Sequence, residues 1–220
     1  MAKIKTIKVL IIDEQPVYSM GISLLLEESK KFNIVGIVNT PDEAVKTAQK
    51  ENPSFVIMEI RLGKENGIDL IKKLKALNPY IMILVVSSND EQYYSERVLR
   101  AGARGYIMKT EKSEKINEAI NTILDGKIYL SEAERERVFQ AITGERTRGV
   151  KDRTVSIKKL SNRELQVFTL IGKGYGTIEI ASMFKISTKT IDSHKEHLKL
   201  KLHCNTSQEL RQLAIEWTKT

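Results

Sequence analysis

The sequence has one cysteine, one tryptophan, four prolines and three histidines among its 220 residues. Because Cys204 is the single thiol, an intrachain disulfide is excluded. His194, His197 and His203 lie near Cys204, and imidazoles three apart on a helix can share a metal. We nevertheless expect no zinc site, because His194 belongs to an apolar helix face and Cys204 follows the end of that helix.

Long hydrophobic runs are also missing. Runs such as Ile81–Val86 are far shorter than the roughly 20 apolar residues that a membrane-spanning helix needs. The opening residues Met1–Thr6 lead toward a strand and lack the hydrophobic region of a signal peptide. We therefore expect a cytoplasmic protein without a membrane segment.

Positive charge is concentrated toward the C-terminus. Residues 1–130 carry 19 Lys plus Arg against 17 Asp plus Glu, whereas residues 151–220 carry 13 against 7. Such a basic excess on a small domain indicates a polyanionic partner, most often nucleic acid, although acidic lipids and ribosomal surfaces also fit. The length suits two modest domains, and the shift in charge favours that division.

Short apolar runs alternate with longer amphipathic segments along residues 1–130. The expected strands are solidly apolar, as strands buried on both faces are: Ile7–Ile12, Ile34–Val38, Phe55–Ile60, Ile81–Ser87 and Gly105–Met108. The expected helices have apolar residues three or four apart: Tyr18–Ser29, Pro41–Gln49, Gly67–Leu77, Tyr93–Ala101 and Ser113–Leu124. This order predicts an α/β domain with five parallel strands joined by crossover helices.

Polar side chains stand at the carboxyl ends of these strands, where open parallel sheets place their sites. Asp13 and Glu14 follow the first strand, Glu59 ends the third, Ser87 ends the fourth and Lys109 follows the fifth. Three carboxylates at one edge repel one another unless a divalent cation or an ammonium group compensates them. A metal-dependent phosphotransferase or nuclease is an alternative. We disfavour it because no catalytic histidine, second acidic motif or phosphate-binding glycine loop accompanies the cluster.

With these residues in these places, residues 1–130 resemble the receiver domain of a bacterial two-component response regulator, a flavodoxin-like (βα)5 fold. The resemblance implies that Asp13 and Glu14 match an acidic pair that binds Mg2+, and that a histidine kinase donates the phosphate. Ser87 and Lys109 match the hydroxyl and the lysine that complete the site, and Tyr106 matches the aromatic residue that reorients on activation. The metal candidates are Asp13, Glu14 and Glu59, although no cofactor is expected to be required.

Glu59 stands where that family carries its phosphate-accepting aspartate. The added methylene moves the carboxylate by about 1.5 Å, which reactive geometry does not tolerate, so we expect acyl phosphate formation to be severely impaired. The longer side chain can accept a hydrogen bond from Ser87 and pair with Lys109 as a phosphate does. Its single charge and two oxygens make any mimicry partial.

Two less patterned segments follow. In the loop after Glu59, Gly63 replaces the family's usual proline, and Lys64 is placed to reach back toward the carboxylates. Residues 131–156 are charged and weakly patterned, with one short helix expected at Glu132–Gln140. We interpret them as an interdomain linker.

Residues 157–220 carry the pattern of a helix-turn-helix domain. Ser161 and Glu164 predict a capping box at the start of a helix. A second, short helix is expected at Thr177–Phe184, and after a tight turn a longer basic helix spans Thr188–Leu202. Short helix, turn and longer basic helix is the plan of a DNA-binding module.

The outward face of that last helix is expected to enter the major groove of double-stranded DNA. Its lysines can neutralise phosphates, whereas Asp192, Ser193 and Glu196 can read base edges such as the cytosine amino group. The candidate DNA contacts are Lys189, Thr190, Asp192, Ser193, Lys195, Glu196 and Lys199. An ordinary solvated helix is the alternative.

Residues 160–217 resemble the NarL/LuxR-type output domain. The motifs that carry the resemblance are Leu160–Glu164, Glu179–Ala181, Ile186–Ile191, Asp192–His194 and Leu200–Leu202. The resemblance implies an all-α, four-helix domain whose third helix reads DNA and whose fourth helix forms a dimer contact. The dimer candidates are Leu210, Leu213 and Trp217, and Trp217 packing within its own domain is an equal alternative.

The sequence therefore predicts a transcription regulator of the NarL/LuxR response-regulator type, a homodimer that binds double-stranded DNA and is not an enzyme. Glu59 predicts control that is independent of aspartate phosphorylation, through constitutive release of the DNA-binding domain, a ligand, a partner or protein abundance. The alternative is a conventionally switched regulator that is still phosphorylated, or is gated by a ligand, at the receiver. A histidine kinase or another receiver-binding protein is the candidate partner.

Overall fold

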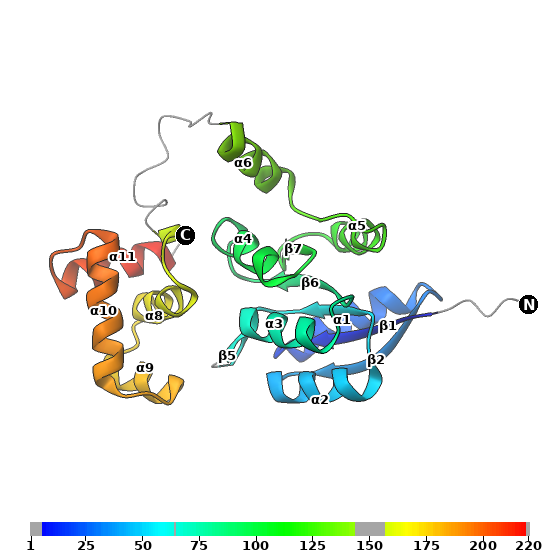
Figure 1. The fold of residues 1–220 in the computed structure, drawn as a ribbon, viewed down its shortest axis with the longest axis horizontal. Coiled ribbons are helices and arrows are strands. Elements are labelled where there is room, and N and C mark those ends of the chain that lie inside the picture. The colour runs from blue at the N-terminus through cyan, green and yellow to red at the C-terminus, as the bar shows by residue number, and fades with distance from the viewer. Residues whose placement is uncertain (1–5, 64, 144–156, 219–220) are drawn as a thin grey trace, which may run out of the picture. The chain divides into compact units, whose positions relative to one another are not determined.

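The computed structural model describes residues 6–63, 65–143 and 157–218. The chain divides into two compact units, Met1–Glu145 and Arg146–Thr220 (Figure 1). Among the described residues, no helix is both long and apolar enough to cross a membrane.

The first unit contains a five-stranded parallel sheet in the order β2-β1-β3-β6-β7. Its strands are β1 (Ile7–Ile12), β2 (Phe32–Val38), β3 (Phe55–Met58), β6 (Met82–Ser87) and β7 (Gly105–Met108). The connecting helices are α1 (Pro16–Glu27), α2 (Pro41–Glu51), α3 (Gly67–Leu77), α4 (Glu91–Ala101) and α5 (Ser113–Leu124). The predicted α/β fold class is confirmed.

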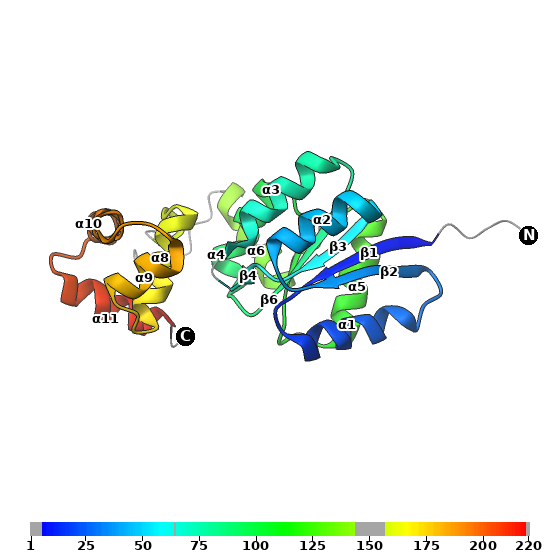
Figure 2. The ribbon, with the colours of Figure 1, turned by 90° about the horizontal axis from the view of Figure 1, so that it is seen from below.

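Helices cover both faces of this sheet. Helices α1 and α5 lie on one face, and α2, α3 and α4 lie on the other (Figure 2). Residues on the central strands are almost completely buried, among them Val9, Phe55 and Leu84 at 0 % exposure. Burial on both faces explains why these strands are continuous apolar runs, and it fixes the strand ends as one rigid edge.

A small two-stranded ribbon follows β3 where the sequence predicted a loop. It pairs β4 (Arg61–Leu62) with β5 (Glu65–Asn66) in antiparallel register. Gly63 turns the chain between them at a φ of 59°, a left-handed conformation that proline cannot adopt. Gly67 then packs against the Ile60 backbone so closely that a Cβ would lie 2.3 Å from Ile60 O. Lys64 lies outside the described residues.

Helix α6 (Glu132–Thr143) belongs to the first unit, although the sequence assigned it to the linker. The chain leading to it pairs with the β7 edge, where Tyr129 forms a parallel bridge with Gly105. Ser95 on α4 then donates a 2.7 Å hydrogen bond to the buried Glu134 carboxylate on α6. The rest of the predicted linker, residues 144–156, lies outside the described residues.

The second unit contains α8 (Asn162–Gly172), α9 (Thr177–Phe184), α10 (Thr188–Leu202) and α11 (Ser207–Thr218). The predicted capping box is present, because Ser161 and Glu164 satisfy each other's backbone N–H groups at the start of α8. Gly176 starts α9, and a left-handed residue, Lys185, ends it before the turn into α10. The predicted helix-turn-helix geometry is therefore formed by α9 and α10.

Candidate functional site: a carboxylate-filled cradle and an exposed helix face

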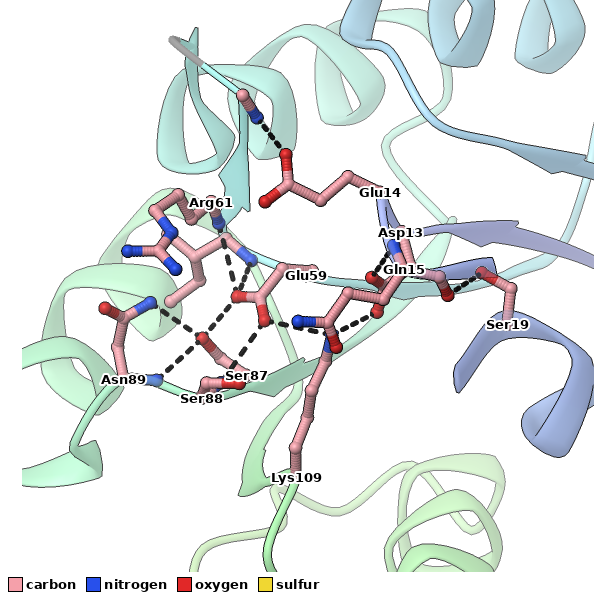
Figure 3. A network of polar contacts seen from close by, with 12 residues as sticks. Asp13, Glu14, Gln15, Ser19, Glu59, Arg61, Ser87, Ser88, Asn89 and Lys109 are labelled. Carbon is pink, nitrogen blue, oxygen red and sulfur yellow. Dashed lines mark hydrogen bonds and ion pairs between the residues drawn. The ribbon is translucent and has the colours of Figure 1, made fainter. Parts of the chain in front are cut away.

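The carboxyl ends of β1, β3, β6 and the chain after β7 bring Asp13, Glu59, Ser87 and Lys109 together (Figure 3). The first three lie at the ends of adjacent strands in the sheet. Asp13 and Glu59 are 6 % and 5 % exposed, and Ser87 is completely buried. The strand ends thus form a closed polar site rather than an open surface.

Donors surround the Glu59 carboxylate. Glu59 Oε1 accepts from the backbone N of Ile60 at 2.7 Å, from that of Arg61 at 3.2 Å and from the Ser87 hydroxyl. Glu59 Oε2 accepts from the backbone N of Ser88 at 3.2 Å. We call this set of donors, together with the Lys109 ammonium, the cradle.

Lys109 compensates part of the charge of the buried carboxylates. Its Nζ lies 3.2 Å from Glu59 Oε2, 2.6 Å from Asp13 Oδ2 and 3.1 Å from Gln15 Oε1. The Tyr18 ring covers the same ammonium at 4.4 Å. Burial raises the pKa of Asp13, and the hydrogen bond and charge of Lys109 oppose that rise. A two-to-one ratio of carboxylates to ammonium leaves a net negative site, partly compensated by backbone dipoles.

Glu14 does not join this cluster, contrary to the expectation for an acidic pair. Its side chain is exposed and accepts a 2.6 Å hydrogen bond from the backbone N of Gly63 (Figure 3). Within the described ranges, no group of three or more Asp, Glu, His or Cys residues is placed to hold a metal ion. The predicted set of Asp13, Glu14 and Glu59 therefore does not converge on one ion.

Tyr106 is completely buried beside the cradle. Its hydroxyl donates to Asn89 O at 2.6 Å, and the Asn89 side-chain amide donates to Ser87 Oγ at 2.9 Å. Burial raises the pKa of Tyr106 well above its ordinary value, so the phenol is a neutral donor. Tyr106 is thus connected to Glu59 through Asn89, whose backbone O accepts from Tyr106 and whose side chain donates to Ser87, and through Ser87 itself.

Sequence reasoning missed several groups of this site. The backbone N–H groups after Glu59, the Ser88 N–H, Gln15, Tyr18 and Asn89 all contribute contacts. The signal that could have identified them is their position in the sequence, because each follows the end of a strand by only a few residues.

In the second unit, α10 buries Ile191, Leu198 and Leu202 and exposes the opposite face. Most of the candidate DNA contacts lie exposed: Lys189, Thr190, Asp192, Ser193 and Glu196. Two lysines differ from expectation because they are half-buried and paired. Lys195 contacts the Thr177 hydroxyl on α9, and Lys199 lies 2.9 Å from Glu196.

The apolar face of α11 packs inside its own unit. Leu210 is 2 % exposed, Leu213 is half-buried, and the Trp217 ring lies 5.3 Å from the Phe168 ring of α8. Leu210 is therefore closed to a partner, which corrects its prediction as a dimer anchor. For Trp217 the structure favours the alternative of packing within its own domain.

Comparison with known proteins identifies both units. Residues 9–121 match the response regulator receiver domain, and residues 158–214 match the luxR family of bacterial regulatory proteins. The chain is 30% identical over 210 residues to the oxygen regulatory protein NreC of Staphylococcus aureus, covering 95% of this chain and 97% of that protein.

Solved structures of RcsB share the fold. RcsB from Salmonella enterica serovar Typhimurium bound to promoter rprA with the phosphomimetic BeF3- has a TM-score of 0.70 at 24% identity, covering 96% of this chain and 99% of that one. A structure of two RcsB dimers bound to two parallel DNAs has a TM-score of 0.57 at 24% identity, covering 98% and 100%.

Proposed function

The chain belongs to the response regulators that join a receiver domain to a luxR-family regulatory module, and from this membership we propose that it binds double-stranded DNA as a homodimer to regulate transcription. This family membership replaces the alternative of a metal-dependent phosphotransferase. We propose that it acts in the cytoplasm, where a regulator of transcription in bacteria meets DNA.

The DNA-binding part of the proposal depends on α9 and α10. They form a helix-turn-helix whose second helix exposes a polar face and buries its apolar one. The RcsB complexes with DNA support a similar use of the same fold. The dimer surface of this chain lies elsewhere than on Leu210, because that side chain is buried within the unit.

The proposed switching mechanism rests on one observation, namely that the Glu59 carboxylate occupies the cradle. In a receiver, a phosphoryl group on the aspartate would need the hydroxyl, the lysine and the backbone N–H groups that here bind Glu59. We propose that Glu59 stands at the phosphoacceptor position and holds Ser87 and Tyr106 in the switched arrangement without phosphate. Its single charge makes the stabilisation weaker than that of a phosphoryl group.

Mg2+ does not fit this site as it stands. The Lys109 ammonium lies between Asp13 and Glu59, and Glu14 is engaged with Gly63. We therefore propose that DNA binding requires neither Mg2+ nor a histidine kinase, and that any receiver-binding partner acts through contacts rather than phosphoryl transfer.

The test is DNA binding by the untreated full-length protein, compared with the same protein after incubation with acetyl phosphate and Mg2+. Salt dependence of the affinity identifies phosphate contacts, and mass spectrometry measures phosphate uptake. We expect specific binding that is unchanged by the treatment, with no added phosphate. Weak binding that phosphate uptake rescues would instead establish the conventional switch.

A further inference from the structure

The exposed face of α10 has an unusual chemical character, and an inference from it rests on the proposed DNA binding. Lys189, Asp192, Glu196 and Leu200 follow one another at intervals of three or four residues, and Ser193 is next to Asp192. All five are exposed. Residues at this spacing lie on one face of a helix. We call Asp192, Ser193 and Glu196 the acceptor strip.

When they are ionised, the carboxylates of Asp192 and Glu196 accept hydrogen bonds and donate none. Ser193 could in principle donate, but its hydroxyl donates to Lys189 O at 3.0 Å within the helix. The Ser193 oxygen therefore acts only as an acceptor toward a group outside the helix. The strip thus presents acceptors at three neighbouring positions.

Three lysines of α10 pair with other groups of the second unit. Lys195 contacts Thr177 on α9, and Lys201 lies 2.7 Å from the buried Glu164 carboxylate of α8. Lys199 has a side chain only 18% exposed and lies 2.9 Å from Glu196 Oε1, which leaves Glu196 Oε2 for another donor. This pair also holds the Glu196 carboxylate in place and compensates its charge.

We propose that the acceptor strip selects cytosine in the major groove. Cytosine presents an amino donor there, whereas guanine presents only the acceptors N7 and O6, and adenine sets an N7 acceptor beside its amino group. An acceptor-only strip is repelled by guanine and gains less from adenine.

The distance between Asp192 and Glu196 also predicts how far apart the two cytosines lie. These residues are about 6 Å apart along the helix, or on the order of two base steps, so about one base pair separates the two cytosines. Leu200 is 73% exposed one turn further along. An apolar side chain there suits the methyl group of thymine.

Selection of binding sites from random DNA by the full-length protein tests the proposal. We expect cytosine at the two strip positions of the selected site. Replacing such a cytosine by thymine exchanges the amino group for a carbonyl, and wild-type affinity should fall by about tenfold.

Glu196→Gln and Asp192→Asn are nearly isosteric and add amide donors. Because Gln and Asn pair with the adenine edge, each variant should lose its cytosine preference at one position and prefer adenine instead. Glu216→Gln on α11 removes the same charge outside α10 and should leave the selected site unchanged. Trp217 fluorescence confirms that each variant is folded, and the cytosine-to-thymine comparison needs no variant.

The outcomes separate the two proposals. Failure to enrich any sequence would contradict DNA recognition itself. Enrichment of a specific site that has guanine at the strip positions, or that both variants select unchanged, would refute the acceptor strip while DNA binding stands.

Discussion

The Tyr106 hydroxyl joins a buried aromatic residue to the loop after β6 through its 2.6 Å bond to Asn89 O. Tyr106→Phe removes this donor and leaves a carbonyl without it, at an expected cost of about 1 kcal/mol in the free energy of unfolding. Amide hydrogen exchange around Asn89 should become faster. Tyr80→Phe, at a side chain 90% exposed, is the control and should change nothing. Unchanged exchange in Tyr106→Phe would show that the bond does not hold the loop.

His194 predicts a pH dependence of the second unit. Burial lowers its pKa, as do Arg163 and His197, while Glu164 opposes them. Because the folded pKa lies below the unfolded value of about 6.5, the unfolded state binds the proton first. The contribution of His194 is complete above that unfolded pKa and is lost as pH falls through the folded pKa.

Urea unfolding followed by Trp217 fluorescence measures this effect, since Trp217 is the single tryptophan and packs on Phe168. The midpoint should be lower at pH 5.5 than at pH 7.5, and His194→Gln should reduce the difference. His203→Asn is the matched control, because Asn tolerates the left-handed backbone at that exposed position. A pH difference that survives His194→Gln would assign it to other groups.

At the level of single residues, the sequence correctly placed Glu59, Ser87 and Lys109 at one edge of the sheet, because the carboxyl ends of buried parallel strands meet there. It grouped Glu14 with Asp13 incorrectly. Successive side chains on extended backbone point in opposite directions, so one of two adjacent carboxylates faces Lys109 and the other faces Gly63. The position of the Gly63 N–H depends on the β4–β5 turn, which the sequence did not reveal.

The contact between α4 and α6 depends on few polar groups. Glu134 is 2% exposed, accepts from Ser95 and pairs with Arg137. Ser131 at the start of α6 also donates to Glu91 of α4 at 2.5 Å. Since α4 follows the loop whose Ser88 N–H belongs to the cradle, this contact connects α6 to the cradle through α4.

Ser95→Ala should loosen α6. A hydrogen bond to a buried charged group contributes about 1.5–3 kcal/mol, and its loss should speed amide exchange across residues 132–137. Ser23→Ala, which removes an exposed hydroxyl bonded to Glu27 on α1, should not. Protection of α6 that is equal in both variants would contradict this role of Ser95.

The helices and strands of the receiver were predicted because burial on both faces leaves a strong apolar pattern. The differences lie where that pattern is weak. Helix α1 begins two residues earlier than predicted, with Pro16 in its first turn, a position that proline favours. Helix α6 was assigned to the linker because its sequence is charged and weakly patterned, and because its contact between Glu134 and Ser95 cannot be read from the sequence.

Over the whole molecule, the basic excess of the second unit does not translate into a row of free lysines on α10. Lys189 is the exposed lysine at the start of that helix, whereas Lys195 and Lys199 are paired. Lys189→Gln should therefore weaken binding uniformly across sequences and reduce the salt slope by about one, without changing base preference. Lys173→Gln removes the same charge outside α10 and is the control. It should change neither the affinity nor the salt slope.

The sequence identified two domains and their family through pattern and motif. It could not identify the dimer surface, because an amphipathic helix such as α11 presents the same apolar pattern whether it packs within one chain or between two. Leu210 is buried in its own unit, and the Trp217 ring packs on Phe168.

The most direct test of the central claim is the DNA affinity of Glu59→Ala beside that of the wild-type protein, with neither phosphorylated. Alanine leaves the cradle donors without their acceptor, and Glu14→Gln, which alters a carboxylate outside the cradle, is the control. If Glu59 holds the switched arrangement, Glu59→Ala should bind the same site at least tenfold more weakly while Glu14→Gln binds normally. Equal affinity for wild type and Glu59→Ala would contradict the claim.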